Sequence, residues 1–302
     1  MVNYYLTLPL TYKILSSTPL TRTFYRKLSN ILGDRLKSKQ GLNQFRVDQG
    51  RKIVDLLKQY SDIKDGGTAL EIGTGWIHWY ANFVRVFYDL KIDLFDVWDN
   101  RQFNTMKQYL SELPNFLSPE ERAVCNLSLI EKASSAESVE KFYELLNYTY
   151  TINPKGTLTD YPSEKYNMVF SVYVLANIQR SLLYNGYIKD LYRVLKPGGY
   201  SIHIVDSGDQ YRHMDTKNTH IKEYLKISDT TWKRYFENSL HYFNRMQISE
   251  YLDLFERAGF ELVYKEQVYA DITDVKLSPD FQKFSPDDLK THNMIIMHRK
   301  PA

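Results

Sequence analysis

Apolar positions in the first part of the chain recur at spacings of three and four, which predicts helices. The pattern runs through YKILSSTPLTRTFYRKLSNILGDRLK, residues 12–37, and again through FRVDQGRKIVDLLKQYS, residues 45–61. Gly66 and Gly67 then interrupt it. We therefore expect a helical N-terminal cap over residues 1–67.

Beyond residue 67, short apolar runs alternate with helical patterns. This alternation is typical of βαβ units and of a parallel sheet. The last two apolar runs, 260–270 and 292–300, have no strong helix between them, which predicts an antiparallel pair at the end of the sheet. The pattern predicts a doubly wound α/β fold with a mostly parallel, seven-stranded, Rossmann-like sheet. The other predicted strands lie at 68–76, 91–99, 148–152, 166–175 and 200–206, with a helix over 180–195.

Two stretches interrupt the alternation and are interpreted as insertions in a domain over 68–302. Residues 101–147 are rich in helix formers and carry the helix-start signal Ser118-Pro119-Glu120-Glu121. Residues 207–245 are polar and aromatic. The second stretch follows the fifth predicted strand, at the edge where open α/β sheets bind ligands. It therefore predicts a lid.

Charge and cysteine content limit the partners, the kinds of site and the compartment that suit this chain. The 302 residues have a net charge of +3, but residues 1–57 carry ten Lys and Arg against three Asp and Glu. A solvated helical face explains this charge most simply, and an anionic substrate, a membrane surface or RNA would also fit it. The single Cys125 excludes an internal disulfide and a cysteine-based zinc site, and it suits the cytoplasm. No run of about 18 apolar residues occurs, so we expect no membrane span.

The turn Glu71-Ile72-Gly73-Thr74-Gly75 joins a predicted strand to a predicted helix. Glycines there let the backbone approach a ligand closely. Trp76 occupies the place where a dinucleotide site needs a third glycine, which argues against a diphosphate. Asp96 ends the next strand, where a carboxylate can accept hydrogen bonds from both ribose hydroxyls, and Asp99 is the alternative.

Four motifs together resemble the class I S-adenosylmethionine (SAM) dependent methyltransferases: LEIGTGW, DLFDVWD, YNMVFSVYVLANI and LYRVLKPGGYSIH, in that order and at that family's approximate spacing. The EIGTGW start, and an NR pair before the last helix, also resemble an uncharacterised bacterial group of methyltransferases. The resemblance covers residues 68–302 and implies SAM as cofactor. It implies that the methionine part of SAM contacts the first turn and that a later strand forms the floor. The implied cofactor residues are Glu71, Gly73, Thr74, Gly75, Trp76, Asp96, Ser171 and Val172.

The chain departs from this family at Ala176-Asn177, where many relatives carry Glu-His. A base for the methyl acceptor must then come from elsewhere. Histidine is the first candidate because its pKa lies near neutrality. We expect His213 or His220 ahead of His203, with Asp206 at the strand end. Three His and three Asp lie within 203–220, but their spacing matches no metal site, and none is expected.

The acceptor is expected to be a hydroxyl or amine of a small molecule or glycan precursor. An RNA methyltransferase that uses the basic head is the alternative, although SVYVLANI lacks the Asn/Asp-Pro-Pro-aromatic tetrad of enzymes that methylate base nitrogens. A non-catalytic SAM-binding protein is a third interpretation. The sequence predicts no oligomeric state.

Overall fold

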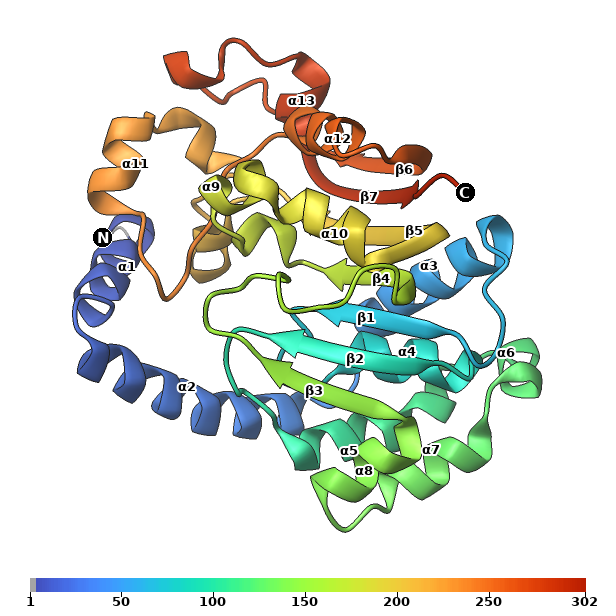
Figure 1. Ribbon diagram of the computed structural model, residues 1–302. Helices are drawn as coiled ribbons and strands as arrows, with labels where there is room; N and C mark the ends of the chain where they lie inside the picture. The colour runs from blue at the N-terminus through green and yellow to red at the C-terminus, as the bar shows by residue number, and fades with distance from the viewer. Residues whose placement is uncertain (1–3) are drawn as a thin grey trace. The chain divides into compact units, whose positions relative to one another are not determined.

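The computed structural model describes residues 4–302, apart from the side chains of Tyr4, Leu6, Asp34, His213 and Met214. Its centre is a seven-stranded sheet in the order β3-β2-β1-β4-β5-β7-β6 (Figure 1). The strands are β1 Thr68–Ile72, β2 Lys91–Asp96, β3 Tyr148–Ile152, β4 Tyr166–Val172, β5 Leu195–Asp206, β6 Glu261–Tyr269 and β7 Thr291–Arg299.

The direction of the strands confirms the predicted fold class. β1 pairs in parallel with β2 and β4, and β2 pairs in parallel with β3. β7 runs against β5, because Ser207 N donates to His292 O and Lys300 N donates to Gly199 O. The sheet is therefore mostly parallel and ends in antiparallel strands.

Strands β1 and β4 are buried along almost their whole length, as parallel strands covered on both faces should be. One of the buried carboxylates in this region is Asp93 on β2. It is paired with Lys165 and accepts a 2.5 Å hydrogen bond from the Tyr166 hydroxyl. Burial of a charge is tolerated here because the charge is neutralised and hydrogen-bonded.

Helices flank the first strands in the chain. The N-terminal helices are α1 Tyr4–Leu15, α2 Pro19–Gln40 and α3 Gln44–Tyr60. Gly50 of α3 lies against the ring of Phe83 in α4, so closely that an added Cβ would be 2.5 Å from the ring. The following helices are α4 Trp79–Phe87, α5 Phe103–Glu112, α6 Pro119–Val124, α7 Leu127–Ser134 and α8 Val139–Leu146. The predicted start at Ser118 forms a capping box with Glu121.

The helix predicted over 180–195 is interrupted in the structure. It consists of α9 Arg180–Leu182, a π-turn over Leu183–Tyr187 and α10 Ile188–Val194. Asn185 and Gly186 leave helical geometry, and Gly186 has φ 119°, which glycine adopts without strain. The later helices are α11 Asp229–Tyr235, α12 Ile248–Arg257 and α13 Pro286–Lys290.

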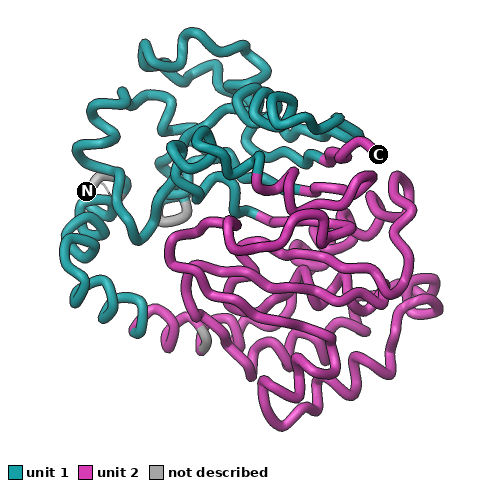
Figure 2. The backbone as a smooth tube through the Cα atoms, in the orientation of Figure 1, with its two compact units in different colours: residues 1–27, 173–189, 203–296 teal, residues 28–172, 190–202, 297–302 magenta. Residues whose placement is uncertain are grey.

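The chain forms two compact units (Figure 2). Unit 1 contains residues 1–27, 173–189 and 203–296, and unit 2 contains 28–172, 190–202 and 297–302. The division into a cap over 1–67 and a domain over 68–302 stays a prediction. Within residues 4–302, no helix is long and apolar enough to span a bilayer.

Candidate cofactor and acceptor sites

The glycine turn after β1 has the open backbone that the sequence predicts. Gly73 and Gly75 both have φ near 65°, in the left-handed region that favours glycine. The nearest atom to a Cβ added at Gly75 would be Gly73 O, at 3.8 Å, so this turn leaves room for a ligand. The turn is fixed from below, because Gly73 N and Thr74 N both donate to Phe95 O.

Asp96 lies at the end of β2, beside the glycine turn. Its Oδ2 accepts a 2.8 Å hydrogen bond from Gly75 N, and its Oδ1 accepts from Val97 N and, at 3.4 Å, from Trp98 N. A carboxylate has about four acceptor positions, so one position and the weak contact to Trp98 remain for two ribose hydroxyls. Asp99, the alternative, is half exposed and paired with Arg101 at 2.6 Å. The geometry therefore favours Asp96.

A buried hydrogen-bonded chain of side chains lies under the turn. Thr74 Oγ1 is 2.5 Å from Glu71 Oε2 and 2.8 Å from His78 Nδ1, and His78 Nε2 is 2.8 Å from the Tyr143 hydroxyl. Burial raises the pKa of Glu71 to about 8 and lowers the pKa of His78 to about 3. His78 is therefore neutral, and Glu71 is the group of this chain that gains or loses a proton near neutral pH.

His78 and Tyr143 were missed by sequence reasoning. The stretch after Trp76 was interpreted as helix, whereas α4 begins at Trp79 and His78 is a left-handed residue before it (φ 47°). The only signal available was a histidine four positions after Thr74, at the start of an apolar helix. Such a residue is common enough that the sequence alone did not single it out.

Trp76 contacts α2. Lys37 Nζ lies 3.0 Å from the centre of its ring, and a Cβ on Gly33 would be 1.9 Å from the ring. Trp76 O accepts from Gln102 N, whose side chain in turn bonds Asn30. Trp76, which argues against a diphosphate, is thus the residue through which α2 contacts the glycine turn.

The two residues expected at the floor of the cofactor site end β4. Ser171 is fully buried and Val172 is 7% exposed. Their position at the carboxyl end of a strand beside β1 suits a floor residue. The cofactor contacts of all eight predicted residues stay predictions.

The predicted acceptor residues belong to unit 1. Asp206 ends β5, and its Oδ1 accepts from Gly208 N at 2.8 Å. His203 is buried in β5 with its ring 5.4 Å from that of Phe255, which is the environment of a core histidine. His220 accepts from Lys222 N at Nδ1, and its Nε2 is 2.7 Å from Asp271 O. Both ring nitrogens of His220 therefore already bind backbone groups. The side chain of His213 lies outside the described residues.

Around Asp206 the structure brings together residues that sequence reasoning missed. Tyr173 follows β4 with φ 61°, a rare conformation for a non-glycine residue, and its hydroxyl accepts from Asn293. His292 is the second residue of β7, and its carbonyl accepts from Ser207 N. Burial lowers the pKa of His292, while Asp206 acts in the opposite direction. Because β7 is antiparallel, its start lies at the carboxyl edge of the parallel strands, and this could be recognised only once the pairing was known.

A buried lysine supports this cluster. Lys222 donates to Ser207 O, Thr291 O and the Tyr224 hydroxyl, at 2.7–3.1 Å. Burial lowers its pKa to about 7. All three of its donor positions are used by the protein, so Lys222 fixes the backbone on both sides of the cluster.

The segment 207–245 packs against α1 through aromatic rings and hydrogen bonds. The Tyr5 hydroxyl donates to Asp209 at 2.5 Å, and its ring contacts those of Tyr211 and Phe236. Lys13 Nζ donates to two carbonyls at the end of α11. These contacts make α1 and the segment one packed body in unit 1. Their role as a lid stays a prediction.

Asn177 occupies the position at which many relatives have histidine, and its side chain is hydrogen-bonded on both sides. Its side chain donates to Tyr173 O and accepts from Gln210 Nε2 at 2.6 Å. Asn244, of the NR pair, donates to Leu175 O and Ile178 O on the same loop. The loop after β4 is thus held from both sides by amide side chains.

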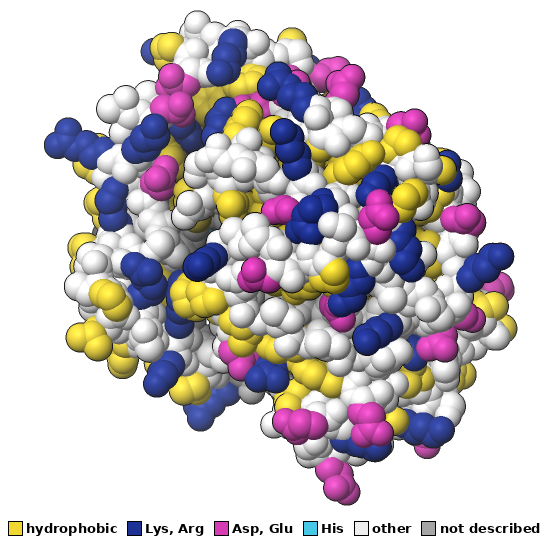
Figure 3. Space-filling model, in the orientation of Figure 1, with side chains coloured by type: hydrophobic (Ala, Val, Ile, Leu, Met, Phe, Trp, Pro, Cys, Tyr) yellow, Lys and Arg dark blue, Asp and Glu magenta, His cyan; other side chains and the backbone are white. Residues whose placement is uncertain are grey.

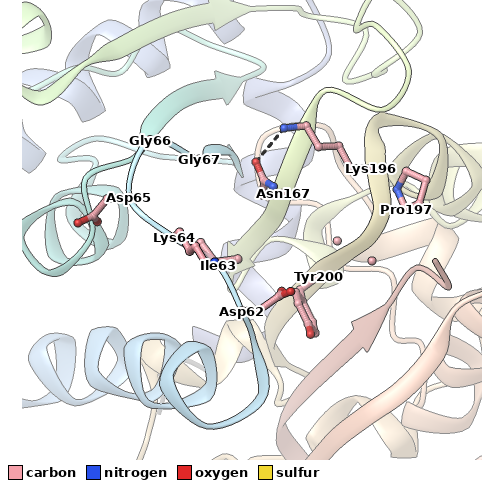
Figure 4. A pocket seen from close by; sticks show the side chains of 12 residues that line it. Asp62, Ile63, Lys64, Asp65, Gly66, Gly67, Asn167, Lys196, Pro197 and Tyr200 are labelled. Carbon is pink, nitrogen blue, oxygen red and sulfur yellow. Dashed lines mark hydrogen bonds between the residues drawn. The ribbon is translucent and has the colours of Figure 1, made fainter.

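A separate hollow of about 460 Å³ lies within unit 2 (Figure 4). Its walls are residues 62–67, Asn167 and residues 196–200, with Lys196 Nζ 3.0 Å from Asn167 Oδ1. These residues stand at the amino ends of β1, β4 and β5. The hollow is therefore at the opposite edge of the sheet from the glycine turn, and it does not belong to the cofactor site. In the described part of the chain, no group of three or more His, Cys, Asp or Glu side chains is placed to hold a metal ion.

Comparison with solved structures finds several methyltransferases of low sequence identity. A phosphoethanolamine N-methyltransferase of Haemonchus contortus has a TM-score of 0.46 and 15% identity over 84% of this chain and 53% of its own, so this chain spans about half of that protein. A SAM-dependent methyltransferase of Mesorhizobium loti has a TM-score of 0.42 and 12% identity, over 81% and 96% of the two chains. A geranyl diphosphate C-methyltransferase of Streptomyces coelicolor has a TM-score of 0.46 and 11% identity, over 84% of this chain and 78% of its own.

No curated protein matches the chain in sequence. The family model described as a methyltransferase domain matches residues 45–265, which is more than two thirds of the chain. This match includes the glycine turn, Asp96 and the segment after β5. The chain therefore belongs to the family of methyltransferase domains.

Proposed function

We propose that the protein transfers the methyl group of SAM to a hydroxyl or amine of a small molecule or glycan precursor. The observation that carries the proposal is the pairing of an open glycine turn with a carboxylate, in which Asp96 binds Gly75 N and keeps acceptor capacity for a diol. A nucleoside with a free ribose fits this arrangement, and a diphosphate does not, because Trp76 occupies the third-glycine position.

The residues that would hold the cofactor are those of the turn. Asp96 would accept hydrogen bonds from the ribose hydroxyls, and the backbone of Gly73–Gly75 would hold the methionine part. When bound, SAM supplies an electrophilic methyl group on a sulfonium. The buried Glu71 lies beneath this region with its carboxyl hydrogen-bonded to Thr74. An ammonium group above the turn would favour the ionised form of Glu71.

The acceptor needs a base if it is a hydroxyl. His213, His220, His203 and Asp206 are the residues proposed from the sequence, and we add His292 beside Asp206. His292 is half-buried with a lowered pKa, so it is neutral and able to accept a proton at pH 7. Asp206, at the end of β5, would orient it.

We also propose that the protein acts in a reducing compartment, the cytoplasm, because Cys125 is free and buried. It includes no bound metal. An RNA acceptor would be revealed by binding that falls steeply as salt rises.

A screen of hydroxyl and amine acceptors with methyl-labelled SAM tests the proposal. We expect label in a small-molecule or glycan product. Label transferred only to RNA would replace this proposal by the nucleic-acid alternative, and the absence of transfer to any class together with intact SAM binding would favour a non-catalytic protein.

A further inference from the structure

Helix α2 displays its apolar side chains to solvent. Leu20 is 83% exposed, Phe24 66%, Ile31 56% and Leu36 61%. Leu28 and Leu32 are also exposed, and all six residues fall on one side of the helix at 100° per residue. An amphipathic helix of a globular protein ordinarily turns such a stripe toward the core. In α2 the stripe points the other way.

The opposite side of α2 explains this orientation. It is small or polar, and it is already bound: Gly33 lies against Trp76, and Asn30 bonds Gln102. Rotating the helix to bury the stripe would break all of these contacts. The exposed stripe is therefore a property of the packed helix.

Positive charge accompanies the stripe. Over 19–40 the sequence contains six Lys and Arg against one Asp. Lys27, Arg35 and Lys39 are exposed. Figure 3 shows hydrophobic and basic side chains next to one another over α2, at the lower left. Two further apolar residues, Leu10 and Ile14 of α1, are 41% and 71% exposed.

We propose that α2 binds the surface of a membrane that contains anionic lipids, with the helix lying in the plane of the interface. Leu and Phe side chains on one face, with Lys and Arg beside them, are the composition of helices that bind in this way. The apolar residues would enter the boundary between headgroups and acyl chains. The exposed Lys and Arg would attract the negative surface.

Charge complementarity selects this partner over two others. A second copy of the chain, paired face to face through α2, would bring two equally basic surfaces together, which costs free energy. A nucleic acid would attract the lysines and arginines but would not use a continuous row of leucine, isoleucine and phenylalanine. Only an anionic lipid surface uses both properties.

This inference does not depend on the acceptor that the enzyme methylates. The substitutions below lie on the outer face of α2, whereas Trp76 and the glycine turn are contacted from its inner face. Loss of lipid binding with an intact cofactor site is therefore distinguishable from failure of the proposed function.

Flotation of the full-length protein with vesicles tests the proposal, using vesicles of phosphatidylcholine alone and vesicles that also contain phosphatidylglycerol. We expect binding to the anionic vesicles only. Phe24→Asp combined with Ile31→Asp, and separately Lys27→Glu combined with Arg35→Glu, should each reduce the bound fraction by about tenfold or more. The matched control is Leu262→Asp with Val268→Asp, two exposed apolar residues of β6, which should bind as the wild type does.

Circular dichroism and S-adenosylhomocysteine binding show that each variant is folded. Absence of vesicle binding by the wild type overturns the proposal. So does loss of binding in the charge variant with full binding in the apolar variant, since simple electrostatic attraction then suffices. A dimer that only the apolar variant disrupts, without vesicle binding, assigns the stripe to self-association.

Discussion

Glu71 shows how one residue can combine a sequence motif with an unfavourable environment. It is 1% exposed, and burial raises its pKa to about 8. Between about pH 4.5 and pH 8, the folded state therefore holds a proton that the unfolded state has already released. Stability contributed by this group is complete below the unfolded pKa and is lost as the pH rises through the folded pKa.

Replacing Glu71 with Gln should remove this dependence, because the amide keeps an oxygen for Thr74 and carries no charge. We expect the variant to gain stability over the wild type as the pH rises from 5 to 8, by at most roughly 4 kcal/mol, since one proton contributes about 1.4 kcal/mol per pH unit. Denaturant unfolding without cofactor at both pH values measures it. An equal difference at pH 5 and pH 8 would show that Glu71 is ionised in the folded protein.

The candidate bases differ in how their ring nitrogens are engaged. His220 binds backbone groups at both nitrogens, whereas His292 lies within electrostatic reach of Asp206. With an acceptor in hand, His292→Ala should lower turnover by about 10²–10⁴ and leave cofactor affinity unchanged. The turnover of His213→Ala and of His220→Ala is measured in the same assay. Loss of turnover in only one of these two variants would show that the base belongs to the segment 207–245.

At the level of elements, the sequence predicted which stretches form helices but not which faces they bury. The spacing of Leu20, Phe24 and Leu28 identified α2 as a helix. Periodicity cannot tell which side packs, since that depends on a partner such as Trp76. The periodic pattern likewise could not predict the π-turn, because Gly186 is tolerated in a helix as well as in a turn.

The contact of α2 with Trp76 gives a prediction about this element. Gly33→Ala adds a Cβ 1.9 Å from the Trp76 ring, so the helix or the ring must move. We expect a loss of about 1–3 kcal/mol in stability and weaker cofactor binding, since Trp76 follows the glycine turn directly. Thr23→Ala, an exposed position on the same helix, is the control. Thermal unfolding and calorimetry compare the two variants, and equal values would mean that α2 does not support the turn.

For the whole molecule, the mostly parallel seven-stranded sheet and its antiparallel ending were predictable because each strand is a distinct apolar run. The proposed cofactor residues could be named from the sequence because they lie at predicted strand ends, as Glu71–Gly75 and Asp96 do. Groups that meet only after folding were not predictable. His78 reaches Tyr143, and His292 reaches Ser207 after β5, through contacts between positions 65 and 85 residues apart.

The most direct test of the account is calorimetric titration of the full chain with S-adenosylhomocysteine and with NAD. We predict that S-adenosylhomocysteine binds and NAD does not, because Asp96 is placed for a ribose and Trp76 excludes a diphosphate. Asp96→Ala should weaken binding by roughly 1.5–3 kcal/mol, the worth of hydrogen bonds to a charged group. Binding of NAD without binding of S-adenosylhomocysteine would contradict the account.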